Sequence, residues 1–455
     1  MNASTTRTIA AHIRGQARRA FSSAAGGAAR SRAALAGGLG ASAVAVAAAA
    51  YTWNQDRLSS PSLLSSALPT AECKAAAPKS LDAPSDVDMT PLGLDFTHRG
   101  AGGYKDPTIL DPKQPMSKRM AAFTRELQAE IVGSLESLER AAGNPNPTPF
   151  FRDAWTRPDG HGGGQSCVLA EGRVFEKAGV MVTSMEGNLS EGGVKQMRAH
   201  GREFNLPPGR VPFFAAGISI VIHPNNPHAP TSHMNYRYFE VRHPDTGETV
   251  SWWFGGGADL TPTYVDTAEA SHFHAQLKSS CDRHLGAEGY PALKGWADEY
   301  FKLPHRGETR GVGGTFFDDL DLASPHAKKL QSKEDIFAFV RDAGRAFVPA
   351  YAPLVARNYA RHFTSADKEW QQLRRGRYVE FNLVYDRGTK FGLLTPGARI
   401  ESILVSMPLT ARWEYCHAPV AGSRAEWTLD VLRRPRDWMG VGVGEAVDQR
   451  DRVAR

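Results

Sequence analysis

Three polar side chains with complementary chemistry occupy alternate positions in one short stretch of the sequence. His233, Asn235 and Arg237 are separated by aromatic or apolar residues. In a β-strand this spacing places all three side chains on one face of the sheet. Imidazole exchanges protons near neutral pH, and guanidinium binds carboxylates through paired hydrogen bonds. The stretch therefore indicates a site for an anionic substrate beside an acid–base residue.

The segments on either side extend this candidate site. An apolar run at 213–222 leads to His223, and a Pro/Asn-rich loop then turns the chain towards His233. Further on, Gly255–Gly257 follow an aromatic run and precede Asp259. Glycines at the end of a strand allow a ligand to approach the backbone closely, with Asp259 at its edge. An ordinary glycine turn after a core strand is the alternative.

Two later segments are rich in arginine. They span 305–321 and 374–402, and their Arg-containing turns suit a substrate with several carboxylates. The first also contains Asp318, Asp319 and Asp321. Such a run could bind a divalent cation, but we favour ion-pair partners or a solvated turn.

Cysteine spacing excludes several classes of site. The four cysteines lie at 73, 167, 281 and 416, so there is no CxxC pair. Zinc ribbons, thioredoxin-like redox pairs and iron–sulfur clusters therefore have no ligand set. With 41% hydrophobic and 22% charged residues, the composition is that of a globular protein.

Periodicity predicts the elements that must position these residues. Apolar residues spaced by three or four indicate a helix from about Ser117, ended by Gly143. Strands are predicted at 166–169, 174–183, 213–222, 235–241 and 250–254, then a late one at 378–385. Helices are predicted at 267–285, 291–301, 333–362, 366–374 and 399–406. Short turns between strands favour antiparallel pairing. The expected fold is α+β, a single large domain with a mostly antiparallel sheet covered by helices on both faces.

The net charge of +6 belongs to the beginning of the chain. Residues 1–55 contain six of the 54 basic residues and no acid, which leaves 48 basic against 48 acidic residues in the rest. An Arg/Ser/Ala-rich, acid-free amphipathic segment is typical of an organelle transit peptide. The neutral remainder argues against a nucleic-acid partner. The expected organisation is a mitochondrial targeting segment at 1–55, a Ser/Pro/Ala-rich linker at 56–115 and a catalytic domain at 116–455.

The uncharged stretch 33–55 has two interpretations. It is long enough to cross a bilayer but is mostly Ala and Gly, and therefore only weakly apolar. It is either the second half of a bipartite signal for the mitochondrial intermembrane space or a linker without sorting value.

Four long motifs in order resemble the oxygen-dependent coproporphyrinogen III oxidase family of haem biosynthesis. They are HPxNPxxPTxHxNxRxFE from His223, WWFGGGxDLTP from Trp252, HRGExRGxGGxFFDDL from His305 and RRGRYVEFNLxYDRGTKFGL from Arg374. The resemblance implies oxidative decarboxylation of two propionates of coproporphyrinogen III to vinyl groups, which consumes O₂ and gives protoporphyrinogen IX. It also implies that O₂ is a co-substrate and that neither a metal nor an organic cofactor is needed.

The resemblance also implies roles for individual residues. His233 would be the catalytic proton donor, and Asp259 would accept the pyrrole N–H groups. The substrate contacts would come from Ser219, Asn235, Tyr236, Arg237, Gly397, Ala398 and Arg399. The family is homodimeric, with Tyr378–Arg412 near the interface. A mitochondrial location, in the intermembrane space with peripheral association with the inner membrane, is the matching expectation.

Two rival functions remain open from the sequence. Bacterial relatives have metal-binding histidines assigned at positions equivalent to His223, His274 and His305. A metal-dependent oxygenase or hydrolase built on His223, His233, His274 and a carboxylate is therefore the first rival. His272 and His274, two apart in a predicted helix, do not share a face. The second rival is a non-catalytic tetrapyrrole carrier, which would keep the arginines but tolerate the loss of His233 and Asp259.

Overall fold

A computed structural model of the chain describes residues 102–146, 149–189, 209–394 and 398–440, with a few further positions between 94 and 206. All of these belong to one compact unit within 79–455. The predicted targeting segment 1–55 and most of the predicted linker lie outside the described residues, and so does Gly397. Within the described part, no helix combines the length and the apolar character needed to cross a membrane.

A seven-stranded antiparallel sheet forms the centre of the fold, as predicted. Its order is β1-β2-β3-β4-β5-β6-β9. The strands are β1 (Phe151–Thr156), β2 (Gly162–Ala170), β3 (Phe175–Asn188), β4 (Pro212–Pro224), β5 (Thr231–Arg242), β6 (Thr249–Thr261) and β9 (Gly314–Leu320). The first six strands follow chain order, and β9 joins beside β6 after two helices. A separate hairpin pairs β7 (Lys302–Leu303) with β8 (Glu308–Thr309).

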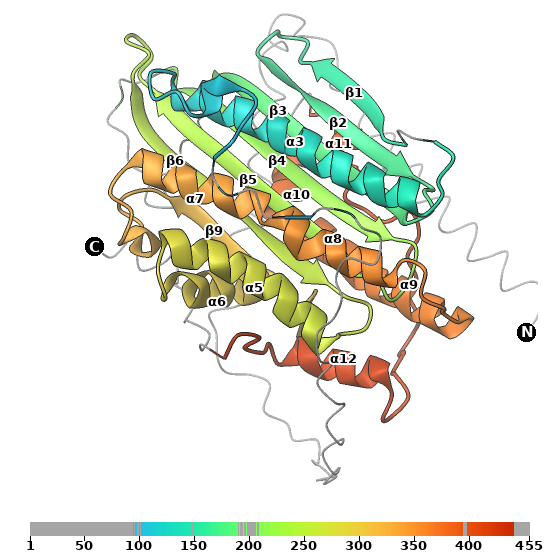
Figure 1. Cartoon of the computed structure of the whole chain (residues 1–455). Helices are drawn as coiled ribbons and strands as arrows, with labels where there is room; N and C mark the ends of the chain where they lie inside the picture. Colours follow the sequence, from blue (N-terminus) through green and yellow to red (C-terminus); the bar gives the residue numbers. More distant parts are fainter. Residues whose placement is uncertain are drawn as a thin grey trace, which may run out of the picture. The chain divides into compact units, whose positions relative to one another are not determined.

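One face of the sheet packs against long helices and forms the main core. Figure 1 shows α3 (Met116–Ala141), α7 (Lys333–Arg345) and α8 (Phe347–Asn358) across this face, with α5 (Thr267–His284) beside them. α6 (Gly289–Tyr300) packs against β9. The even-numbered side chains of β4 and β5 enter this core, among them Ile218, Ile220, Ile222, Met234 and Tyr236.

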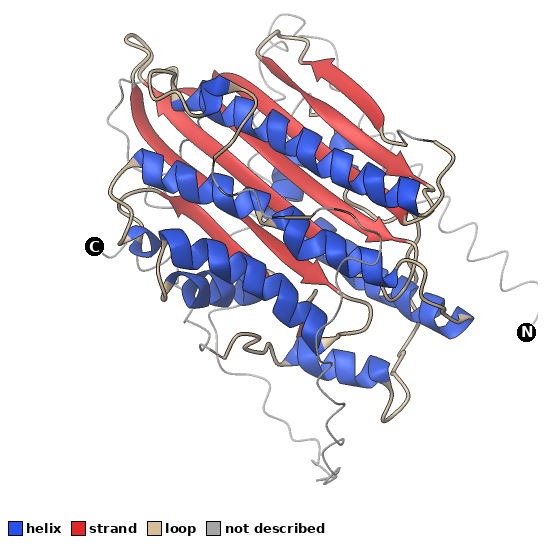
Figure 2. Cartoon of the chain, viewed as in Figure 1, coloured by secondary structure: helices blue, strands red, loops and turns tan. Residues whose placement is uncertain are grey.

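The opposite face is covered by segments from the last quarter of the chain. They are α9 (Ser365–Glu380), a π-helical turn η3 (Phe381–Tyr385), α10 (Arg387–Leu394) and α11 (Ile400–Leu404), and α10 and α11 lie behind the sheet in Figure 2. The Tyr378 ring packs edge-on against His223 of β4. Helices therefore cover both faces, as predicted. The last helix, α12 (Arg424–Arg433), lies near β8.

Two predicted elements differ from the structure. The predicted strand 378–385 is wrong, because this stretch is the end of α9 and the π-helical turn. Its aromatic and β-branched residues imitate a strand, but a capping box between Thr364 and Asp367 begins a helix that runs into them. The predicted helix 333–362 is divided at Ala346 into α7 and α8.

Strand lengths were underestimated where glycine is frequent. β6 continues through Gly255–Gly257 to Thr261, so these glycines lie within a strand and not at its end. β9 begins at Gly314 and was not predicted, and neither was the polar β1. Glycine is tolerated in these strands because neighbouring backbone approaches closely: a Cβ at position 314 would lie 1.9 Å from the Ala258 carbonyl oxygen.

The contact at Gly314 generates a stability prediction. Gly314→Ala should lower the free energy of unfolding by about 1–3 kcal/mol, because the methyl group forces β9 away from β6. Gly133→Ala is the matched control, since a Cβ at this position in α3 meets no atom within 4 Å apart from the backbone of its own helix and its chain neighbours. It should raise stability by about 0.5–1 kcal/mol. Urea unfolding of both variants would measure the difference, and equal stabilities would contradict the close packing of β6 and β9.

Candidate active site

Strand register brings the candidate residues from three strands onto one face. His233 lies between Val221 and Asp259, and Asn235 between Ser219 and Gly257. Arg237 lies between Gly217 and Gly255. Directly opposed residues in a sheet point to the same side. The expected common face of His233, Asn235 and Arg237 is therefore confirmed, with Ser219 and Asp259 on it.

His233 is held by a carboxylate. Its Nδ1 atom donates to Oδ1 of Asp259 at 2.9 Å. A carboxylate only accepts hydrogen bonds, so this contact places a proton on Nδ1. The His233 side chain is 21% exposed, whereas that of Asp259 is 1% exposed. Among the described residues Nε2 of His233 has no hydrogen-bond partner, and it is the atom left for a substrate.

Arg310 completes a buried charge cluster. Its Nε donates to Oδ2 of Asp259 at 2.9 Å and its Nη2 to Oδ1 at 2.7 Å. Its Nη1 donates to Oδ1 of Asn382 in the π-helical turn at 3.0 Å. Burial alone would raise the pKa of Asp259, but the Arg310 guanidinium and the His233 hydrogen bond outweigh it and lower the pKa. Asp259 is therefore a carboxylate at neutral pH.

Arg237 lies flat across the sheet towards β9. Its guanidinium pairs with Asp318 at 2.7 Å, and Nη1 donates to Oδ1 of Asn235 at 3.2 Å. Gly255 makes this path possible, because a Cβ there would lie 2.9 Å from Nε of Arg237. Asp318 and Asp319 together oppose Gly255 in a bulge, with Asp319 at φ 51°. The aspartate run supplies an ion-pair partner, as favoured from the sequence.

Two described C-terminal candidate residues, Ala398 and Arg399, lie near β1, at one edge of the sheet. Arg399 pairs with Asp153 of β1, and its guanidinium carbon lies 5.9 Å from the centre of the Trp155 ring. Ala398 precedes it and is half-buried. In the strand register, Asp153 of β1 lies directly opposite Ser166 of β2. The same row of opposed residues continues through Met181 and Ser219 to Asn235. Arg237 on β5 and Arg399, the N-cap residue of α11, therefore lie on the same face of the sheet.

Tyr236 is not brought into this group. Its side chain is fully buried in the main core on the opposite face, because neighbouring residues of a strand alternate between faces. Only main-chain atoms of Tyr236 remain for a contact on the His233 face.

The histidines of the metal-dependent rival do not converge. Nε2 of His223 donates to the Ser406 carbonyl at 2.9 Å. His274 lies in the core on the other side of the sheet, between the Val312 carbonyl and the Tyr290 hydroxyl. His305 contacts Tyr385 and Glu380 near the surface. Within the described ranges, no group of three or more His, Cys, Asp or Glu could hold a metal ion. Nε2 of His272 hydrogen-bonds to the Pro349 carbonyl oxygen at 2.9 Å. His272 and His274 therefore have different partners, as expected from their spacing.

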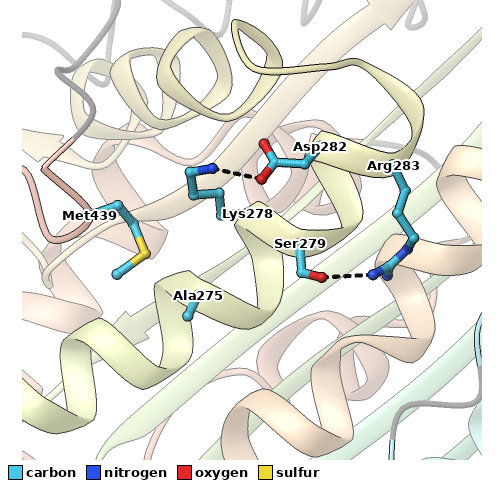
Figure 3. Close-up of a pocket in the computed structure, with 6 residues that line it drawn as sticks. All are labelled: Ala275, Lys278, Ser279, Asp282, Arg283 and Met439. Carbon is cyan, nitrogen blue, oxygen red and sulfur yellow. Dashed lines mark hydrogen bonds and ion pairs between the residues drawn. The ribbon is translucent and has the colours of Figure 1, made fainter.

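Two hollows lie away from His233. One, of about 420 Å³, is formed by α5 and Met439, and its charged groups are paired: Lys278 with Asp282 at 2.6 Å and Arg283 with Ser279 at 2.7 Å (Figure 3). The other, of about 640 Å³, lies between α3 and strands β1–β3. Neither contains a predicted site residue, so the sheet face that carries His233, Asn235 and Arg237 remains the candidate site.

Comparison with known proteins decides the family. The profile of the coproporphyrinogen III oxidase family matches residues 119–438. The mitochondrial oxygen-dependent coproporphyrinogen-III oxidase of Homo sapiens is 54% identical over 324 residues, which cover 71% of this chain and 67% of that protein. The Drosophila melanogaster oxygen-dependent enzyme is 51% identical over 332 residues, covering 73% and 80%. The chain belongs to the coproporphyrinogen III oxidase family.

Plastid members of the coproporphyrinogen III oxidase family are also similar. The chloroplastic coproporphyrinogen-III oxidase 1 of Arabidopsis thaliana is 45% identical over 345 residues, covering 75% of this chain and 85% of that protein. The family match includes every described candidate residue and also Arg310, which sequence reasoning did not select. Arg310 lies in the motif HRGExRG, which was one of the four motifs that indicated the family. Nothing in the spacing of this motif shows that Arg310 contacts Asp259, which is 51 residues away in the sequence.

The buried His223 generates a pH prediction. Burial, with a contribution from the nearby Arg375 charge, lowers its pKa to about 3. The unfolded chain binds this proton near pH 6.5. The stability contribution of neutral His223 is therefore complete above about pH 6.5 and is lost progressively as the pH falls towards 3.

We expect His223→Gln to lose less stability than the parent between pH 7.5 and pH 5. The difference should be about 2 kcal/mol, because the amide cannot be protonated but can still donate to Ser406. Denaturant unfolding at both pH values measures it. Parallel losses in parent and variant would show that His223 does not stay neutral in the folded protein.

Proposed function

We propose that this chain is an oxygen-dependent coproporphyrinogen III oxidase that acts in haem biosynthesis. It converts two propionates of coproporphyrinogen III to vinyl groups and gives protoporphyrinogen IX. The observation that carries this proposal is the placement of His233, anchored on a buried carboxylate, beside Arg237 on one face of the sheet in a chain of this family. A tetrapyrrole with four propionates requires such cations and a proton-transfer group.

The chemistry explains why a proton donor is needed. Each propionate loses CO₂ and one hydrogen, and two electrons pass to O₂. The balance R–CH₂CH₂–COO⁻ + O₂ + H⁺ gives R–CH=CH₂ + CO₂ + H₂O₂, so one proton is consumed for each propionate. Because Nδ1 already carries a proton towards Asp259, the proton to be donated is the second one of doubly protonated His233, which lies on Nε2 and is directed away from Asp259.

The remaining roles are proposed from the resemblance to the family. Arg237 and Arg399 bind propionates, and each is held in the free protein by an aspartate, Asp318 and Asp153. Ser219 and Asn235 supply hydrogen bonds between them. Gly397 and Ala398 contact the substrate through their main chain, as does Tyr236. Both oxygens of Asp259 accept hydrogen bonds from Arg310 or His233, so we propose that Asp259 acts through His233; its acceptance of pyrrole N–H groups stays a prediction.

Exposed apolar side chains support a homodimer. The segment Tyr378–Arg412 carries six large exposed hydrophobic residues among those described: Leu383, Val384, Leu393, Leu394, Ile400 and Leu409. Such a concentration is typical of a protein–protein interface. A second copy of the chain is the partner we propose.

A mitochondrial location fits the basic, acid-free beginning of the sequence and the mitochondrial relatives. The stretch 33–55 favours the intermembrane space, with peripheral contact with the inner membrane. We propose that the catalytic domain begins near residue 116, close to the start of α3 and of the family match.

His233→Ala should lower kcat by about 10²–10⁴-fold, because the proton donor is lost. The control His243→Ala, in the β5–β6 turn, should keep the parental rate. Product formation from coproporphyrinogen III is measured with and without O₂. Parental turnover by His233→Ala would refute the catalytic role of His233, and product formation without O₂ would overturn the mechanism.

Leu394→Glu should weaken the dimer by about tenfold or more, since it places a charge in the proposed interface. Val250→Glu is the control, because Val250 is also exposed but lies in β6, outside Tyr378–Arg412. Light scattering after size-exclusion chromatography measures the mass over a range of protein concentrations. An unchanged dimer in Leu394→Glu would place the interface elsewhere.

A further inference from the structure

We propose that Arg310 is a positioning residue that neutralises Asp259, so that Asp259 orients the His233 ring without stabilising its doubly protonated form. The inference rests on the proposed function, in which His233 donates a proton. It assigns a role to a buried residue that acts on His233 only through Asp259.

The geometry separates the two tasks of Asp259. Arg310 binds both carboxylate oxygens, at 2.7 and 2.9 Å, and its side chain is 2% exposed. His233 shares Oδ1 through one hydrogen bond at 2.9 Å. The full charge of Asp259 is therefore matched by a permanent cation. The contact with His233 remains a directional hydrogen bond that fixes which imidazole nitrogen faces the substrate.

The Arg310 guanidinium is held by three aromatic rings and by Asn382. Its guanidinium carbon lies 4.3 Å from the centre of the Phe301 ring, 4.8 Å from Tyr378 and 4.6 Å from Phe381. Asn382 accepts from its remaining nitrogen. Ring faces attract cations, and the enclosure excludes water that could substitute for Asp259. Arg310 therefore cannot turn away when His233 changes its protonation state.

The other titratable groups around Arg310 do not change the charge compensation between Arg310 and Asp259. Tyr378 from α9 has its pKa raised by burial and stays neutral. His223 from β4 is neutral because its pKa is lowered to about 3. Asp386, after the π-helical turn, adds a more distant negative charge that favours Arg310. Arg310 is thus the cation that compensates Asp259 whatever the state of His233.

Removal of Arg310 would reverse the relation between Asp259 and His233. A buried carboxylate without a cation is costly, so protonated His233 would become its counter-ion. The proton would then be harder to release to a substrate. Removal of the Asp259 charge alone would have the opposite effect. The positive charge of Arg310 would then be uncompensated and would disfavour the protonated form of His233.

Three variants of the full chain test the proposal through the pH dependence of kcat/KM. Arg310→Met should move the alkaline limb to higher pH by about 1 unit or more, and lower kcat at neutral pH by about tenfold or more. Asp259→Asn should move the same limb to lower pH. The double variant Arg310→Met/Asp259→Asn removes both charges but keeps an oxygen to accept from Nδ1 of His233. Its limb should return close to the parental position, and its kcat should exceed that of Arg310→Met.

A purely structural role for Arg310 predicts something different. Stability would fall in Arg310→Met, but the limb would stay at the parental pH, and this result would overturn the proposal. A double variant no more active than Arg310→Met would also overturn it. Arg310→Lys provides a measurement if Arg310→Met does not fold: it keeps the charge, so its limb should stay parental, and a shift to higher pH would contradict the proposal. Parental turnover of coproporphyrinogen III is checked first, because its absence refutes the proposed function and not the role of Arg310.

Discussion

A carboxylate buried in an apolar environment must be paired, and the pairing of Asp259 with Arg310 organises the site. Two charges removed from water are tolerated only when the hydrogen-bond geometry is good on every side. The requirement is met by distant parts of the chain: β6 supplies Asp259, the segment after β8 supplies Arg310, and the end of α9 with the π-helical turn supplies Tyr378, Phe381 and Asn382. One buried pair thus joins the sheet to the helices that cover its second face.

Because side chains alternate along the strands, the residues of the main core and the candidate site residues lie on opposite faces of the sheet. In β4 and β5 the even-numbered residues Ile218, Ile220, Met234 and Tyr236 are buried beneath α3, α5, α7 and α8. The odd-numbered residues face the other side with His233, Asn235 and Arg237. A shift of one residue in register would exchange the two faces. The core therefore fixes the position of every polar residue on the opposite side.

The sequence predicted the features that depend on local pattern. The spacing of His233, Asn235 and Arg237 was enough to predict a shared face, and the apolar repeat was enough to predict α3. The strand 378–385 was predicted wrongly, because residue types that favour strands also pack well in a buried helix. Glycine concealed the length of β6 and the start of β9, since its role there depends on neighbouring backbone. Arg310 was missed for a related reason: its partner Asp259 lies on another element, and no local pattern connects them.

The order of strands in the sheet has a consequence for how the protein folds. From β1 to β6 each strand pairs with the next one along the chain, so most of the sheet depends on contacts of short sequence separation, which form quickly. The second face is different, because residues 365–404 must return across more than a hundred residues to reach β4 and β6. We therefore expect the sheet to form before this face is closed. The candidate site would then be the last part of the domain to acquire its native structure.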